Sequence, residues 1–227
     1  IDRVGLHDNF FSIGGDSIKT IQIASRLSKA GYKIEMKDIF ENPTVEKLTP
    51  LLQGAGRVAD QSAVSGNIPL TPIQHAFYQF PITERHHFNQ AVMLAFDEPI
   101  EKDRLETIVD TLQRQHDALR MTYKDTGGKI VQTCHDLDYP VSVEVIDLRD
   151  SQSETAETIE NEANRIQAGI DLENGPLMKA ALFKTHNGDR VLFVVHHLVI
   201  DGVSWRILFE DIETLLQQYK DGPEPEL

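Results

Sequence analysis

The sequence has little of what several classes of protein require. It contains one cysteine, Cys134, so an internal disulfide framework is excluded and a reducing compartment is indicated. It contains 22 Lys and Arg residues against 36 Asp and Glu residues, which gives a formal net charge of −14. This charge argues against a nucleic-acid partner, because phosphate contacts need clustered cations. No apolar run is long enough to span a bilayer, and no signal peptide opens the sequence. We therefore expect a cytoplasmic protein with no membrane partner.

Several chemical motifs are also missing. Gly14-Gly15 is not followed by the Gly-Lys-Ser/Thr of a P-loop. Cys134 has no CxxC partner, so we interpret it as an inert strand cysteine. A metal site built from His196, His197 and Asp201 is disfavoured, because adjacent histidines on a strand point to opposite faces and are poor joint ligands. We expect no metal.

What is present divides into two domains. Apolar residues at helical spacing and short capped segments predict a small all-α bundle over residues 1–53. Residues 54–67 are rich in Gly, Ala, Ser, Asp and Gln without periodicity, and predict an exposed linker. Residues 68–227 alternate strand and helix patterns and predict a layered α/β domain. The best hairpin signal is Gly127-Gly128.

Ser17 is the first candidate functional residue. It follows two glycines and Asp16 at the start of a predicted helix, where free backbone N–H groups and the helix dipole favour an anion such as a phosphodiester. The alternative is that Ser17 or Asp16 only caps the helix. On chemistry alone the cap is the better interpretation.

The second candidate is the histidine pair. An apolar strand, Val191–Val195, leads into His196-His197, and Asp201-Gly202 then turns the chain into a helix predicted over 203–219. An imidazole transfers protons near neutral pH, because its ordinary pKa is about 6.5. Only one of two adjacent strand residues faces a given side, so one histidine should face a substrate and the other should be structural. Two satisfied structural histidines are the alternative.

Residues 1–53 closely resemble the carrier (thiolation) domain of nonribosomal peptide synthetases. The resemblance rests on the stretches Asp8-Asn9-Phe10-Phe11-x-Ile13-Gly14-Gly15-Asp16-Ser17-Ile18-Lys19 and Ile39-Phe40-x-x-Pro43-Thr44-Val45. It implies a carrier four-helix bundle whose Ser17 bears covalent 4′-phosphopantetheine, attached by a phosphopantetheinyl transferase. The thiol of this cofactor holds an aminoacyl or peptidyl thioester. Asp16 is typical of carriers that feed an epimerization domain.

Residues 68–220 resemble the N-terminal half of a condensation-superfamily domain of the same synthetases. Three stretches carry the resemblance: Leu70-Thr71-Pro72-Ile73-Gln74, His116-Asp117-Ala118-Leu119-Arg120-Met121, and His196-His197-x-x-x-Asp201-Gly202. The fold implied is like chloramphenicol acetyltransferase, truncated to one half. His197 matches the family's active-site histidine. His196, Gly202 and a buried Asp201–Arg120 salt bridge would support it.

Two further patterns point to one member of the superfamily. The order Val203-Ser204-Trp205 after the histidines, and the stretch Phe88-Asn89-Gln90-Ala91-Val92-Met93-Leu94, look like the epimerization type. The resemblance implies L-to-D inversion at Cα of the residue carried on Ser17, with His197 as one acid/base group or as a donor to an enolate. The second group would be a glutamate outside this sequence.

Two alternatives stay open. A condensation domain would use His197 to assist amine attack, although such domains usually read Asp-Gly-Trp-Ser. An inactive domain that recruits proteins to a carrier is opposed by the intact histidine motif. The resemblance further implies an adenylation domain upstream and a condensation domain downstream as partners. The amino acid processed and the final product are not encoded in these residues.

Overall fold

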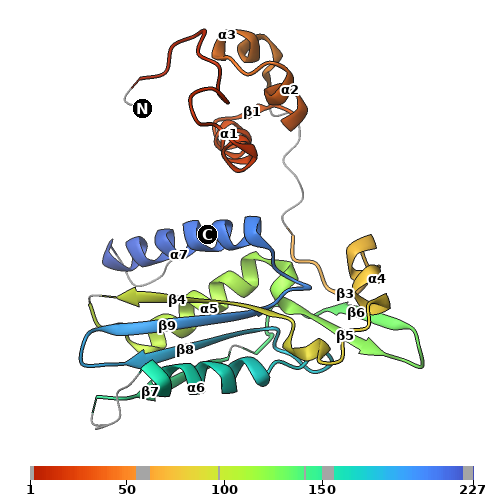
Figure 1. Ribbon diagram of the computed structural model, residues 1–227, viewed down its shortest axis with the longest axis vertical. Helices are drawn as coiled ribbons and strands as arrows, with labels where there is room; N and C mark the ends of the chain where they lie inside the picture. Colours follow the sequence, from red (N-terminus) through yellow and green to blue (C-terminus); the bar gives the residue numbers. More distant parts are fainter. Residues whose placement is uncertain (1–2, 55–61, 97, 141, 150–155, 222–226) are drawn as a thin grey trace. The chain divides into compact units, whose positions relative to one another are not determined.

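The computed structural model describes residues 3–54, 62–96, 98–140, 142–149, 156–221 and 227. The chain divides into two compact units, Ile1–Gln61 and Ser62–Leu227 (Figure 1). Among the described residues no helix is both long and apolar enough to cross a bilayer.

The first unit is helical, as the sequence predicts. Asp16 caps α1 by accepting a hydrogen bond from the Lys19 amide, and Thr44 caps α3 in the same way from Lys47. Gly31, at φ +85°, follows the end of α1 in the left-handed conformation expected there. The elements are α1 (Ser17–Lys29), α2 (Met36–Glu41), α3 (Val45–Leu48) and the 3-10 helix η1 (Thr49–Leu51), with a two-stranded ladder of β1 (Tyr32–Lys33) and β2 (Gln53–Gly54).

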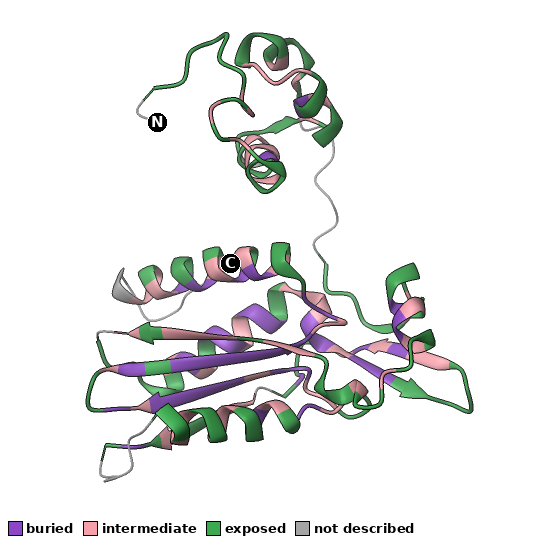
Figure 2. Ribbon diagram, viewed as in Figure 1, coloured by how far each residue is buried: buried purple, intermediate pink, exposed green. Residues whose placement is uncertain are grey.

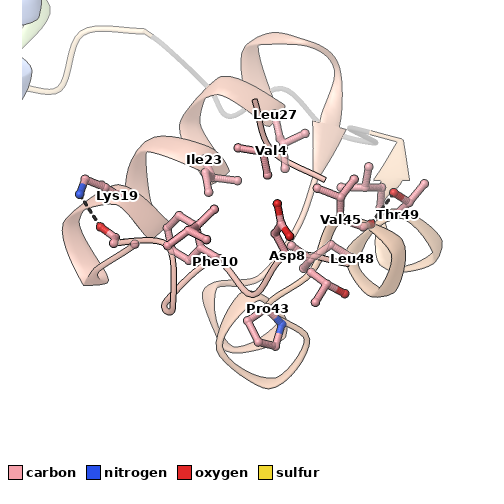
Figure 3. Close-up of a pocket in the computed structure, with 15 residues that line it drawn as sticks. Val4, Asp8, Phe10, Lys19, Ile23, Leu27, Pro43, Val45, Leu48 and Thr49 are labelled. Carbon is pink, nitrogen blue, oxygen red and sulfur yellow. Dashed lines mark hydrogen bonds between the residues drawn. The ribbon is translucent and has the colours of Figure 1, made fainter. Parts of the chain in front are cut away.

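The last helical stretch of this unit divides into α3 and η1, because Pro50 cannot donate a helical hydrogen bond. The apolar faces of α1 and α3 meet around a pocket of about 540 Å³ rather than a filled core. Figure 3 shows Phe10, Ile23, Leu27, Val45 and Leu48 pointing into this pocket. Among the described residues of this unit only Thr20 and Ile39 are buried.

The second unit is built on two small sheets. One has the order β4-β9-β8-β7, with β7 and β8 parallel and the other pairs antiparallel; the second has the order β3-β6-β5. The strands are β3 (Gly66–Ile68), β4 (Asn89–Phe96), β5 (Met121–Asp125), β6 (Ile130–Cys134), β7 (Val143–Asp147), β8 (Met178–Lys184) and β9 (Asp189–His196). The helices are α4 (Pro72–Gln79), η2 (Arg85–His87), α5 (Lys102–Gln115), η3 (Asp117–Arg120), α6 (Ala156–Ala168) and α7 (Gly202–Asp221).

The core of this unit lies around the central strands. Consecutive residues of β8 and β9 are buried, so both faces of these strands are covered (Figure 2). Helices α5 and α7 contact each other, and α6 contacts β8 and β9. In Figure 1 α6 lies in front of the strands and α5 behind them. The layered α/β fold predicted from the sequence is confirmed, including the β5–β6 hairpin whose Gly127 and Gly128 both have positive φ.

The segment expected to be a linker is partly structured. Residues 55–61 lie outside the described residues. Gln53-Gly54 pairs with β1, and β3 pairs with β6 through Gly66, Asn67 and Ile68. Backbone pairing needs no hydrophobic periodicity, so composition alone did not indicate that these residues are held.

Candidate functional site

Ser17 begins α1 with an exposed side chain. The capping role belongs to Asp16, whose Oδ1 accepts from the Lys19 amide at 2.7 Å, and this hydrogen bond lowers the pKa of the Asp16 carboxyl. The Ser17 hydroxyl has no hydrogen-bond partner among the described residues. The alternative that Ser17 itself caps the helix is therefore wrong, and its hydroxyl is available for modification.

The loop before Ser17 explains the two glycines. Gly14 has φ +94°, which favours glycine, and a Cβ on Gly15 would lie 2.5 Å from the Phe10 carbonyl oxygen. Lys19 Nζ donates to the Gly14 carbonyl at 2.5 Å, which places a cation beside the helix N-terminus. The free hydroxyl, the helix end and this cation fit a phosphodiester on Ser17, although the Asp16 carboxylate opposes it.

His196 ends β9 and is completely buried. Its Nε2 lies 2.8 Å from the Arg85 carbonyl oxygen and its Nδ1 accepts from the Leu198 amide at 3.1 Å, so the proton is on Nε2. The Phe77 ring packs edge-on against it at 5.8 Å. Burial lowers the pKa of His196 to about 4, so the ring is neutral near pH 7.

His197 points to the other side and is half-buried. Its Nδ1 lies 2.8 Å from the Ile200 carbonyl oxygen, which accepts only, so Nδ1 carries a proton. Its Nε2 lies 3.1 Å from Nε2 of Gln90 on β4. The Phe88 ring stacks on the imidazole at 5.2 Å. The two histidines thus divide into one buried and one accessible ring, as strand alternation predicts.

Gln90 joins His197 to α7. The Trp205 indole Nε1 donates to Gln90 Oε1 at 2.8 Å, while the other end of the same amide meets His197. Trp205 is buried and stacks on Phe209 at 5.6 Å. Both Gln90 and Trp205 belong to sequence motifs, but their contact could not be predicted, since nothing in the sequence relates two residues 115 positions apart.

The salt bridge expected between Asp201 and Arg120 is absent from the described structure. Asp201 stands directly before α7, where its Oδ1 accepts from the Val203 amide at 3.1 Å and the Ser204 amide at 2.8 Å. These hydrogen bonds, first that from Ser204, lower the pKa of Asp201. Asp201 is engaged as a cap of α7. Gly202 is the first residue of α7, and a Cβ added to it would have no other atom within 4 Å.

Arg120 is instead fully buried among carbonyl groups. Its guanidinium donates to the backbone oxygens of four residues and to Asp117 Oδ1, the last at 2.5 Å. The four carbonyls belong to Val64, Gln113, Arg114 and His135. A planar group with five donors suits several acceptors at once. Val64 lies within the expected linker, and Arg120 therefore binds this segment to the rest of the second unit.

The other two motif stretches, around Gln74 and His116, contact the histidine loop (residues 196–201) or α7, which follows it. Gln74 forms a capping box with Thr71, and its Nε2 donates to the Tyr123 hydroxyl at 2.8 Å and to the Leu198 carbonyl at 3.4 Å. His116 Nε2 lies 2.7 Å from Asp211 Oδ2 on α7. Gln74 thus reaches the histidine loop at Leu198, and His116 reaches the following helix at Asp211.

Neither a metal nor a reactive thiol marks another centre in the part of the chain that the structure describes. No group of three potential metal ligands occurs there. Cys134 is a buried free cysteine in β6, and burial raises the pKa of its thiol. A protonated buried thiol is a poor nucleophile.

Comparison with known families accounts for both units. Residues 64–227 match the condensation domain family. The chain belongs to the condensation-domain family. Residues 1–52 match the phosphopantetheine attachment site family, so this condensation-family chain also carries a unit for covalent 4′-phosphopantetheine.

Curated relatives share this arrangement over nearly the whole chain. Surfactin synthase subunit 1 of Bacillus subtilis (strain 168) is 45% identical over 229 residues, covering 100% of this chain and 6% of the relative. Gramicidin S synthase 1 of Brevibacillus brevis is 43% identical over 219 residues, covering 96% of this chain and 20% of the relative. The chain spans only a small part of these synthases. Carrier and condensation-family units together identify it as nonribosomal peptide synthetase sequence.

Solved structures show the same fold. The epimerization domain from the third module of tyrocidine synthetase B is 41% identical with a TM-score of 0.71, covering 74% of this chain and 39% of that one. The first condensation domain of the calcium-dependent antibiotic synthetase has a TM-score of 0.60 at 22% identity, covering 73% of this chain and 40% of that one. The expected half-domain of the chloramphenicol-acetyltransferase-like fold is confirmed.

Burial of neutral His196 makes stability depend on acid. Because its pKa falls from 6.5 to about 4 on folding, the stabilisation is complete above the unfolded pKa and is lost as pH falls toward the folded one. Lowering the pH from about 7.5 to about 5 should therefore reduce the free energy of unfolding by about 2 kcal/mol through this residue. Urea titrations followed by the fluorescence of Trp205, the single tryptophan, measure it. His196→Gln should lose correspondingly less stability over this range, and an unchanged pH dependence would contradict the assignment.

Proposed function

We propose that this chain inverts the Cα configuration of an aminoacyl or peptidyl group held on Ser17, with His197 as one acid/base residue. The observation that carries the proposal is the hydrogen bond from Trp205 to Gln90, which joins the two stretches that resemble the epimerization type and places them against His197. The 41% identity to an epimerization domain supports the same choice. Condensation domains at 22% identity support only the fold.

Ser17 is proposed as the attachment residue because its hydroxyl is exposed and unengaged at a helix N-terminus. When bound there, 4′-phosphopantetheine supplies a thiol that holds the substrate as a thioester and acidifies its Cα–H. The enzyme's own contribution is to position a group that removes or returns the Cα proton.

His197 meets that requirement at Nε2. The Ile200 carbonyl holds the proton on Nδ1, so the lone pair is on Nε2. It accepts from the Gln90 amide in this structure, and it takes up a proton when substrate replaces that contact. A ring in this state is a base and has no Nε2–H with which to stabilise an oxyanion. The geometry thus favours proton transfer over the alternative role as a hydrogen-bond donor. The stacked Phe88 ring limits the movement of the imidazole.

The test uses the full-length synthetase, loaded at Ser17 by a phosphopantetheinyl transferase with an L-aminoacyl group and incubated in D2O. Loading is checked by mass, and the released product is analysed for chirality and for deuterium at Cα. A mixture of D and L product containing deuterium is expected, with none from the Ser17→Ala control. Confirmed loading with L product alone and no exchange would refute epimerization.

Condensation is the second candidate, and the same material decides it. A downstream carrier loaded with an acceptor amino acid is added to the L-loaded protein. Peptide formed by the second unit without any D product would favour condensation. Absence of both reactions would favour a domain that only recruits proteins to its carrier. The upstream adenylation domain and downstream condensation domain remain expected partners of the proposed epimerase.

A further inference from the structure

The hydrogen bonds around Gln90 have only one consistent direction. An indole N–H donates and never accepts, so the group of Gln90 that faces Trp205 must be its carbonyl oxygen. The amide N–H2 then faces His197, and His197 Nε2 must accept. This direction follows from the chemistry of the indole, which has one N–H donor and no acceptor.

The other side of the ring gives the same answer. A backbone carbonyl only accepts, so Nδ1 of His197 must donate to the Ile200 oxygen. The chain of hydrogen bonds from Trp205 through Gln90 and His197 to Ile200 is satisfied only when His197 is neutral with its proton on Nδ1. Its neighbour His196 has the opposite tautomer, with the proton on Nε2.

We infer that Gln90 and Trp205 are positioning residues that hold His197 in the tautomer with a proton on Nδ1 and a lone pair on Nε2. Trp205 acts through Gln90: it prevents the amide from turning over and presenting its oxygen to Nε2. The indole is buried and Gln90 belongs to β4, so the orientation of the amide is built into the fold. The effect on turnover rests on the proposed function, whereas the tautomer does not.

Gln90→Glu is the decisive substitution. A carboxylate of the same shape still accepts from Trp205, but it offers His197 only an acceptor, so Nε2 becomes protonated. In the full-length synthetase we expect kcat for inversion to fall roughly 10- to 100-fold with KM changed less than about twofold. Trp205→Phe keeps a ring but frees the amide, and a smaller fall in kcat is expected.

The tautomer is read directly from the ¹⁵N chemical shifts of the imidazole nitrogens in the histidine-labelled chain at about pH 8, where an ordinary histidine is neutral. His197 is assigned by its loss in His197→Asn. The expected wild-type signal is protonated Nδ1 with unprotonated Nε2, and Gln90→Glu should protonate Nε2. A wild-type ring with Nε2 protonated, or no change in Gln90→Glu, would overturn the inference.

Phe209→Leu is the matched control, because it removes the ring packed on Trp205 without removing a hydrogen bond. Its tautomer should be unchanged and its kcat within about twofold of wild type. A tautomer shift or kcat loss in Phe209→Leu as large as in Trp205→Phe would assign the effect to packing and overturn the inference. If the synthetase does not epimerize while the ¹⁵N spectra behave as expected, the proposed function fails and the positioning role stands.

Discussion

Replacing His197 by Asn is expected to slow inversion of the loaded group by roughly 10²- to 10⁴-fold, the range that a positioned proton-transfer group supplies. The Asn amide still offers an N–H close to where Nδ1 donates to Ile200, whereas Nε2 has no counterpart. The variant thus removes the lone pair and keeps the local hydrogen bond. Single-turnover assays on the full-length synthetase, loaded separately with L and D substrate, measure the rate.

Deuterium exchange in the same variant separates two roles for His197. If it is the base on one face of Cα, one enantiomer should lose exchange in His197→Asn. The other enantiomer should still exchange through a second group, without inversion. If His197 instead stabilised developing negative charge, both enantiomers would lose exchange together. Inversion within about tenfold of the wild-type rate would contradict any direct part in proton transfer.

A destabilised site has to be distinguished from a lost base. His196→Asn is the control, because His196 is buried, donates to the Arg85 carbonyl and does not face the same side as His197. This variant should lose stability, while the inversion rate of the folded fraction stays within about tenfold of wild type. Equal rate losses in the two variants would assign the effect to folding.

Much of the fold follows from periodicity. The run Val191–Val195 predicts a buried strand and Gly127-Gly128 predict a hairpin, and both predictions depend on local sequence pattern alone. The separation of His196 from His197 also follows from strand alternation alone. Local signals therefore predict that only one of the two histidines is accessible, whereas the choice of His197 came from the family resemblance.

The support of the site could not be predicted in the same way. The Trp205–Gln90 hydrogen bond joins α7 to β4 and depends on how two distant elements cross. The pairing of β3 with β6 depends on backbone groups that every residue carries. The prediction of an Asp201–Arg120 salt bridge was wrong for a related reason. The opposite charges of the two residues do not reveal that Asp201 binds backbone amides of α7 and that Arg120 binds backbone carbonyl groups.

Arg120→Met is expected to lower the free energy of unfolding by about 3–5 kcal/mol, the cost typical of removing one partner from a buried charged network. Methionine fills much of the same space but leaves four carbonyl groups without their donor. Urea unfolding followed by Trp205 fluorescence measures the loss. Arg120→Lys keeps the charge but loses the planar set of donors, so its free energy of unfolding should lie between those of the wild type and Arg120→Met. It remains measurable if the Met variant fails to fold.

The choice of carboxylate partner is the sharper part of this prediction. Asp117 is partly exposed and contributes one of the five acceptors, so Asp117→Asn should cost about 1 kcal/mol or less. Asp201→Asn removes charge from a cap that does not touch Arg120, and its effect should add to that of Arg120→Lys within about 0.5 kcal/mol. A coupling energy of several kcal/mol between Arg120 and Asp201 would instead show that the two residues interact directly. Additivity would leave Arg120 as the residue that holds Val64, the end of α5 and the end of β6 together, without a contact to Asp201.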